Sequence, residues 1–181
     1  MNFQEKTLKR NEIYNGRILS LHVDDIELPN GEKATREIVE HSGGVCVAAI
    51  TDSNELYFVR QYRYPYKKVL LELPAGKLEK GEDPLKAGMR ELEEECGVVA
   101  EKVIPMGTVY PTVAYCSEII HLFAAKGLTD TAQHLDEDEF LSFEKISIDK
   151  AAEMVMNGEI SDSKTAVLVL KIHNLIRENK I

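Results

Sequence analysis

Several features that mark common protein classes are missing from these 181 residues. No apolar run reaches the roughly 18 residues that a membrane-crossing helix needs, and the opening MNFQEKTLKRNE lacks the apolar core of a secretory signal. The cysteines at 46, 96 and 116 have no C-x-x-C spacing, which favours reduced thiols over disulfides or zinc ligands. We therefore expect a cytoplasmic protein with no membrane partner.

Positive charge is also in short supply. The chain has 22 Lys and Arg against 31 Asp and Glu, giving a formal net charge of −9. Nucleic acids and anionic membranes are bound through basic surfaces, so neither is an expected partner. A small phosphorylated ligand remains compatible with this charge, because bound metal and a few local arginines can reverse the potential at its site.

The motifs of several enzyme classes are absent, among them G-x-S-x-G, H-E-x-x-H and G-x-G-x-x-G. The chain instead concentrates acids at 91, 93, 94 and 95, near the end of an expected helix. Like charges four residues apart cost roughly 0.2 to 0.5 kcal/mol, and acids at a helix C-terminus face the negative end of its dipole. A hard divalent cation bound by carboxylate oxygens is the simplest explanation.

Hydrophobic periodicity predicts a mixture of strands and helices. Residues 14–41 are expected to form a hairpin around the turn at 29–31, and the strands at 45–51 and 55–62 are expected to pair as a second hairpin. Further strands are predicted in LLELPAG, VIPMGTV, EIIHLFAA and FLSFEKIS, and two helices in IDKAAEMVMNG and SKTAVLVLKIHNLIREN.

The acids belong to a helix with clear boundary signals. Asp83 can cap its N-terminus, Pro84 suits its first position, and Gly97 stands where a C-terminal glycine belongs. These signals predict a helix of about 13 residues, roughly 20 Å long. Its expected buried stripe consists of Leu85, Met89, Leu92 and Cys96.

The charged residues around this helix can be given roles from geometry alone. Glu91 and Glu95 are one helical turn apart, so their carboxylates can share a cation, and Glu94 joins the same cluster. Arg90 is expected to orient Glu82 or Glu94 through a two-point ion pair. Glycines at 76 and 81, which are free to take φ > 0, would let the preceding loop fold back over the cluster.

The order of these residues matches a known pattern. Gly76 is followed after five residues by Glu82 and after seven more by RELEEECGV, residues 90–98. This spacing resembles the Nudix box, and every fixed position is filled. The resemblance implies an α+β fold, an α/β/α sandwich with a mixed β-sheet between helices.

The Nudix resemblance also implies a chemistry. Family members hydrolyse a nucleoside diphosphate linked to another group, by attack of water on a pyrophosphate. The resemblance assigns Glu91 and Glu95 as metal ligands and Glu94 as a ligand or orienter, and it implies that the carbonyl of Ala75 completes the site. The cofactor is then Mg²⁺ or Mn²⁺, which neutralises phosphate oxygens and lowers the pKa of a bound water.

The segments TREIVEHSGGV, VRQYRYP and ELPAGKLEKGEDP look like the ADP-ribose pyrophosphatase branch of the family. In that branch residues 1–42 would form an N-terminal antiparallel subdomain that joins or exchanges with a second subunit of a homodimer. Residues 43–181 would form the hydrolase domain. Arg36, Arg63 and Glu118 match positions that contact the nucleotide-sugar substrate.

Two further features bear on the branch. A proline usual in it, 16 residues beyond the box, is replaced by Val113, which keeps GDP-mannose and other nucleoside diphosphate derivatives open as substrates. In the acidic loop HLDEDEF, the resemblance implies a glutamate that acts as general base or further ligand, Glu139 first and Glu137 second. The segment SDSKT, residues 161–165, has no expected role beyond capping the last helix through Ser161 or Asp162.

Two readings from other classes remain. One is a Nudix-fold protein that senses a nucleotide sugar without cleaving it, which the complete glutamate set disfavours. The other is a structural metal-binding domain, which would not need Arg36 and Arg63.

Overall fold

The computed structural model describes residues 2–135 and 139–181 and divides into two compact units. Unit 1 consists of Met1–Gly43 and Tyr110–Ile119, and unit 2 of Gly44–Val109 and Ile120–Ile181. The first change of unit, after residue 43, falls next to the boundary expected after residue 42. The second stretch of unit 1, Tyr110–Ile119, was not predicted.

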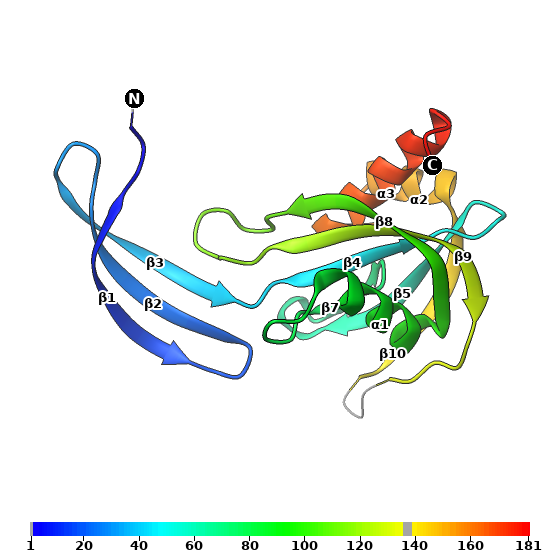
Figure 1. The fold of residues 1–181 in the computed structure, drawn as a ribbon, viewed down its shortest axis with the longest axis horizontal. Coiled ribbons are helices and arrows are strands. Elements are labelled where there is room, and N and C mark those ends of the chain that lie inside the picture. Colours follow the sequence, from blue (N-terminus) through cyan, green and yellow to red (C-terminus); the bar gives the residue numbers. More distant parts are fainter. Residues whose placement is uncertain (1, 136–138) are drawn as a thin grey trace. The chain divides into compact units, whose positions relative to one another are not determined.

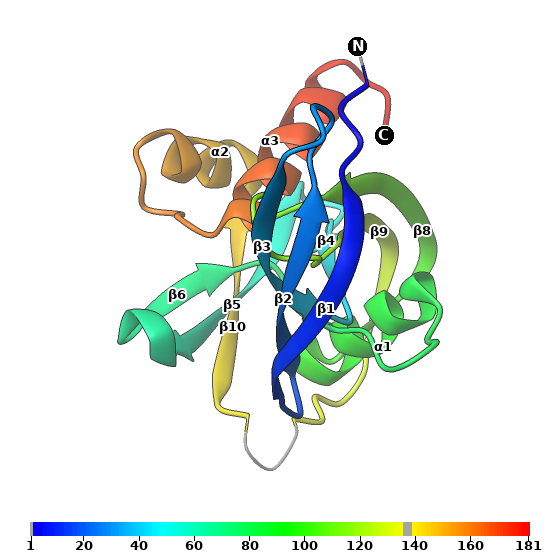
Figure 2. The ribbon, with the colours of Figure 1, turned by 90° about the vertical axis from the view of Figure 1, so that its left-hand side faces the viewer.

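Unit 1 is an antiparallel sheet of β1 (Lys6–Asn15), β2 (Leu19–Glu27) and β3 (Lys33–His41), with β2 in the middle (Figure 2). The predicted hairpin is β2 with β3, and Gly31 in its turn has φ +86°, which glycine adopts without strain. The hairpin's expected start at residue 14 is wrong. A bend at residues 17–18 divides that stretch between β1 and β2.

The second stretch of unit 1 is tied to β3 by backbone hydrogen bonds. The Val39 N–H donates to the Tyr115 carbonyl at 2.7 Å, and the Ser117 N–H donates to the Val39 carbonyl at 2.9 Å. Residues 110–119 therefore extend the hydrogen bonding of the sheet. They include Val113, whose side chain is exposed.

Unit 2 is built on two sheets (Figure 1). One is mixed, in the order β7-β4-β9-β8, with β4 parallel to β9 and the other neighbours antiparallel. The other is antiparallel, in the order β10-β5-β6. Their strands are β4 (Gly44–Ala49), β5 (Glu55–Arg63), β6 (Lys68–Glu72), β7 (Ala75–Lys77), β8 (Val98–Val109), β9 (Ile120–Asp130) and β10 (Leu141–Ser147).

The predicted pairing of β4 with β5 is wrong. These strands belong to different sheets, and an isolated bridge joins Ile50, the residue after β4, to Leu56 of β5. Every residue of β4 is buried, so this strand takes the centre of the mixed sheet, between β7 and β9. Its parallel partner, β9, is remote in sequence, so the short turn between β4 and β5 could not indicate this pairing.

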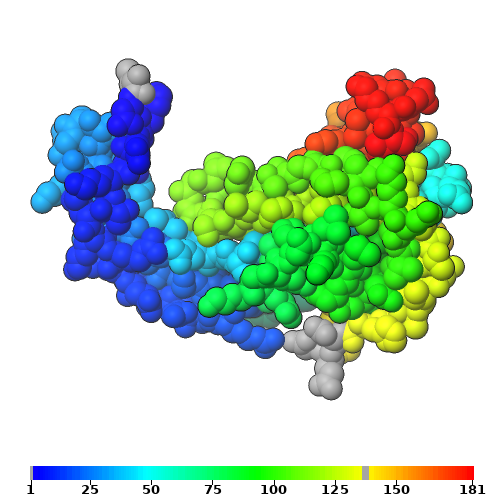
Figure 3. All heavy atoms as spheres, viewed as in Figure 1, coloured from blue at the N-terminus to red at the C-terminus, as the bar shows by residue number. Residues whose placement is uncertain are grey.

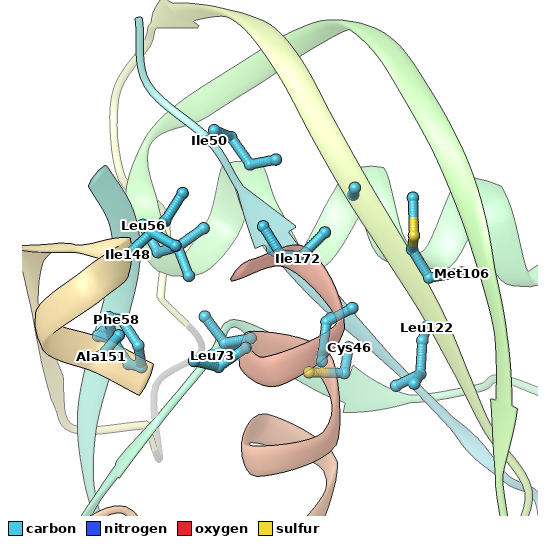
Figure 4. Close-up of a cluster of buried hydrophobic side chains, with 14 of the residues drawn as sticks. Cys46, Ile50, Leu56, Phe58, Leu73, Met106, Leu122, Ile148, Ala151 and Ile172 are labelled. Carbon is cyan, nitrogen blue, oxygen red and sulfur yellow. The ribbon is translucent and has the colours of Figure 1, made fainter. Parts of the chain in front are cut away.

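The helices of unit 2 are α1 (Pro84–Cys96), α2 (Ile148–Met156) and α3 (Ser163–Arg177). Alternate residues of β4 enter two hydrophobic clusters, Cys46 with α2 and α3, and Val47 with α1. Figure 4 shows the first cluster, where Cys46 lies with Ile172 of α3 and Ala151 of α2. The mixed sheet thus lies between helices, which confirms the predicted α+β fold.

The predicted buried stripe of α1 is wrong in its first half. Leu85 and Met89 are exposed, and the buried positions near them are Ala87 and Gly88. A Cβ on Gly88 would lie 3.2 Å from a methyl carbon of Val47, so the small residues let the helix approach the sheet closely. Glu91 and Glu95 lie four and eight residues after Ala87, so they are on the same side of the helix and point toward the interior.

No helix within residues 2–135 and 139–181 is long and apolar enough to cross a bilayer.

Candidate active site

The boundaries of α1 were correctly predicted and set the position of the acidic cluster. Asp83 caps the helix by accepting hydrogen bonds from the Leu85 and Lys86 N–H groups, both at 3.1 Å, and Pro84 begins it. Gly97 ends it with φ +62°. On the face of unit 2 drawn in Figure 3, α1 and β8 lie next to each other.

Glu95 and Glu91 point into the interior of unit 2. The Glu95 side chain is 1% exposed, and its Oε2 accepts a hydrogen bond of 2.9 Å from the Ala75 N–H. Glu91 lies against the backbone of Gly76, where an added Cβ would fall 1.9 Å from the carboxyl carbon. Gly76 is therefore needed for close approach, and of the two glycines expected to be free to take φ > 0, Gly81 does so, at +80°.

Burial makes these two acids hard to ionise. It raises the pKa of Glu91 to about 7, against the lowering effect of the adjacent Arg90 and with smaller increases from the charges of Glu94 and Glu139. Burial also raises the pKa of Glu95 well above its ordinary value, and the charges of Glu139 and Glu91 add to the effect. The positive charges of Arg90 on Glu91 and of Arg63 on Glu95 offset only part of this effect.

Arg90 holds the outer carboxylates of the cluster. Its Nε and Nη2 donate to the two oxygens of Glu82, at 3.1 and 3.3 Å, and its Nη1 donates to Glu94 at 2.8 Å. The same Nη1 lies 2.9 Å from Glu91. Arg90 therefore contacts both of the acids that it was expected to orient, and the ion pair with Glu82 has two points.

The segment after β9 is fastened to the C-terminal end of α1. The Thr131 and His134 N–H groups donate to the Gly97 and Glu94 carbonyls at 2.6 and 3.1 Å. The Gln133 side chain donates to the Glu95 carbonyl at 2.6 Å. These bonds satisfy carbonyls that a helix end leaves without partners.

Beyond that segment, Glu139 accepts a hydrogen bond of 3.1 Å from the Gln61 side chain. Its charge raises the pKa of both Glu91 and Glu95, so the structure brings this acid to the α1 cluster. Glu137, the second choice for the base, lies outside the described residues.

A second charged group lies at the junction of β5, β6 and α3. Arg63 donates to both oxygens of Glu72, at 2.7 and 2.8 Å, and Lys164 donates to Glu72 at 2.6 Å. Lys164 also donates to Asp162 at 3.0 Å. Burial would raise the pKa of Glu72, but the hydrogen bond from Arg63 and the charge of Lys164 outweigh it and hold that pKa below its ordinary value.

The other two predicted substrate residues lie in unit 1. Arg36 is bound to Glu5, with its Nε 3.0 Å from Oε2. Glu118 lies 3.4 Å from Nδ1 of His41. Each is partly exposed and already has a charged or titratable neighbour within its own unit.

This architecture coincides with a described family, because residues 40–165 match the NUDIX domain. The chain belongs to the Nudix family. The resemblance predicted from the box is thereby confirmed. Residues 5–39 of this Nudix protein match the nucleoside diphosphate sugar hydrolase N-terminal domain, which corresponds to the strands of unit 1.

Two relatives resemble this Nudix protein over most of its length. It is 47% identical over 169 residues to the methanol dehydrogenase activator of Bacillus methanolicus, covering 92% of this chain and 91% of the relative. It is 40% identical over 168 residues to the ADP-ribose pyrophosphatase of Bacillus subtilis, with the same two coverages. A solved structure described as an ADP compounds hydrolase has a TM-score of 0.86 at 19% identity, covers both chains fully, and shows the shared fold.

Sequence patterns missed several residues that build the site of this Nudix protein. Gln61 and Gln133 are single polar residues in a strand and a loop, and nothing local indicates what they bind. Glu72 and Lys164 are 92 positions apart, so only the fold brings them together. Asp162 was correctly expected to cap α3, and its carboxylate also accepts from Lys164.

Proposed function

We propose that this protein hydrolyses the pyrophosphate bond of ADP-ribose or a closely related nucleoside diphosphate sugar, giving a nucleoside monophosphate and a sugar phosphate. The chain is a Nudix hydrolase with a complete box. The observation that carries the substrate choice is the 40% identity to an ADP-ribose pyrophosphatase over nearly the whole of both chains. The arrangement of charged groups in unit 2 agrees with such a reaction.

The α1 cluster suits a divalent cation. The charge of Glu139 raises the pKa of both Glu91 and Glu95, and that of Glu91 raises the pKa of Glu95; a cation would relieve this repulsion and favour the ionised forms of Glu91 and Glu95. Among residues 2–135 and 139–181, no three acidic, histidine or cysteine side chains already converge as a complete metal centre. We propose that Glu91 and Glu95 hold Mg²⁺, or Mn²⁺ in its place, with the Ala75 carbonyl and Glu94 as further ligands.

The bound ion would neutralise charge on the phosphate oxygens and activate water. The chain's own residues would position the reactants. Arg90 keeps Glu82 and Glu94 fixed beside the cluster, and Gln61 fixes one oxygen of Glu139. In this proposal Glu139 takes the proton of the attacking water, and Glu137 is the alternative base.

Substrate binding is assigned to Arg63 in unit 2 and to Arg36 and Glu118 in unit 1. The Arg63 side chain is 37% exposed, while two of its nitrogens bind Glu72. We further propose a homodimer, in which the unit 1 strands join or exchange with a second copy and each site receives Arg36 from the other subunit. The free thiols at 46, 96 and 116 support a reducing cytoplasmic location.

Two other functions keep specific support. Val113 departs from the branch pattern, which favours testing GDP-mannose and other nucleoside diphosphate derivatives beside ADP-ribose. The 47% identity to a methanol dehydrogenase activator favours a role in activating an alcohol dehydrogenase. A sensor without catalysis has less support, because every carboxylate of the box is present.

The deciding experiment incubates the protein with Mg²⁺ or Mn²⁺ and a panel of ADP-ribose, GDP-mannose, NADH and diadenosine polyphosphates, and follows the nucleoside monophosphate released. We expect turnover, with ADP-ribose preferred. Binding without turnover on every member would overturn the hydrolase proposal in favour of the sensor. A parallel assay adds the protein to methanol dehydrogenase, with Glu95→Gln as the control, and measures the rate of alcohol oxidation.

A further inference from the structure

The charged group at the α3 junction contains a lysine that the proposed chemistry does not use. The Lys164 side chain is 11% exposed, and its Nζ lies 2.6 Å from Glu72 and 3.0 Å from Asp162. Burial would lower the pKa of this lysine, but the charges of Asp162 and Glu72 raise it above the ordinary value, so it stays protonated. A buried ammonium ion destabilises the folded state unless it is paired with a negative charge. One partner of Lys164 is Glu72, which ends β6 and is far away in the sequence.

Glu72 connects this lysine to the candidate substrate site. Its carboxylate is 1% exposed and binds Lys164 and Arg63 together. Arg63 uses Nε and Nη2 for Glu72, which leaves Nη1 and the outer edge of the guanidinium unassigned to this carboxylate. The Arg63 charge also lowers the pKa of Glu95, so this guanidinium acts electrostatically on the α1 cluster.

The charges of the group balance. Arg63 and Lys164 are positive, and Glu72 and Asp162 are negative. Without the lysine, one guanidinium would face two carboxylates, and a net negative charge would remain where an anionic pyrophosphate is expected to bind. The two-point pairing fixes the plane of the Arg63 guanidinium only while Glu72 itself is held still.

We propose that Lys164 is a positioning residue for the substrate: it fixes and neutralises Glu72, so that Arg63 presents its outer edge to the pyrophosphate. The inference rests on the proposed function. It gives the SDSKT segment a role beyond helix capping, through a residue that lies on α3 and never touches the substrate. It also separates two contributions, since α3 sets the position of the arginine while α1 supplies the carboxylates.

The test uses Lys164→Met, which keeps the chain length and removes the charge, with ADP-ribose and saturating Mg²⁺. KM is expected to rise about tenfold or more, as when a charge-assisted contact is lost, while kcat falls less than about threefold. Lys171→Met is the matched control, because Lys171 is also on α3 but donates to the Met106 carbonyl at 2.5 Å. It should leave KM and kcat as in the wild type.

A second variant guards against loss of folding. Lys164→Met combined with Glu72→Gln restores the charge balance, so its melting temperature should recover. KM should remain high, because an amide offers one acceptor oxygen and cannot form the two-point pair with Arg63. The expected signature is recovery of stability without recovery of KM.

Two results would overturn the positioning role while the wild type is active. One is a folded Lys164→Met with the wild-type KM, and the other is a double variant in which KM recovers together with stability. If the wild type neither binds nor cleaves any compound of the panel, the proposed function fails first, and the positioning role fails with it.

Discussion

Unit 2 contains two groups of buried charge that differ in their balance. At the C-terminal end of α1, burial raises the pKa values of Glu91 and Glu95 by more than the charges of Arg90 and Arg63 lower them. At the α3 junction, Glu72 is buried to the same degree as Glu95 but is bound by two cations, and its pKa is lowered. Burial alone therefore does not distinguish a candidate ligand site from a structural ion pair, whereas the direction of the pKa shift separates the two groups.

Removing a carboxylate from the unbalanced group should have the largest effect on activity. Glu95→Gln keeps an acceptor for the Ala75 N–H but removes the charge that would hold a cation, so kcat/KM should fall on the order of 1,000-fold. The melting temperature in EDTA should hold or rise, because the change relieves repulsion from Glu91 and Glu139. Steady-state kinetics and thermal scans check both, and unchanged activity would contradict the ligand role.

The same substitution in the balanced group should act in the opposite direction on stability. Glu72→Gln leaves Lys164 and Arg63 short of a buried negative partner, which should cost about 3 kcal/mol of unfolding free energy. Urea unfolding of the metal-free protein measures the difference from Glu95→Gln. If both variants gain or both lose stability, the distinction between the two groups is wrong.

The two groups should also give opposite pH dependences in metal-free protein. The pKa of Glu91 rises from 4.5 to about 7, so its contribution is fully present below 4.5 and is lost as pH rises toward 7, by up to about 3 kcal/mol. The lowered pKa of Glu72 contributes stability above its ordinary value of 4.5, and this is lost as pH falls below it.

Urea unfolding in EDTA between pH 5 and 8 tests the Glu91 half of this prediction. Stability should fall across that range in the wild type, and Glu91→Gln should flatten the decline. A wild type that becomes more stable from pH 5 to 8, with no change in Glu91→Gln, would contradict the raised pKa.

Mg²⁺ should give the smallest of the four effects. At a tenfold excess over its dissociation constant, a ligand of the folded state adds about 1.4 kcal/mol of stability. The gain should appear in the wild type and in Lys171→Met and be absent in Glu95→Gln, as thermal scans with and without Mg²⁺ would reveal. An equal gain in Glu95→Gln would place the cation elsewhere.

Local signals predicted much of this molecule correctly. The bounds of α1 followed from Asp83, Pro84 and Gly97, which act within one turn of the chain. The pairing of β4 failed because its neighbours, β7 and β9, are chosen by burial on both faces. The buried stripe of α1 failed at Leu85 and Met89, because Ala87 and Gly88 allow a closer approach than larger side chains would.

The candidate site shows the same division. The box carries its own spacing, so its acids could be assigned from the sequence. Lys164 could not, because its partner Glu72 is 92 residues away and a lysine in an exposed-looking SDSKT gives no sign of burial. Gln133 was missed for a similar reason, since its partner is a main-chain carbonyl that any residue would supply.

The composition of unit 1 from two stretches of chain limits how the protein can be cut. A deletion that begins at Met1 and ends at Gly43 would remove Val39 and leave residues 110–119 without the backbone partners that it supplies. Grafting the first 43 residues onto another Nudix domain would likewise transfer an incomplete module, unless the 110–119 segment moved with it. The transferable block is therefore discontinuous in sequence, and a chimera that exchanges it requires two segments and three junctions.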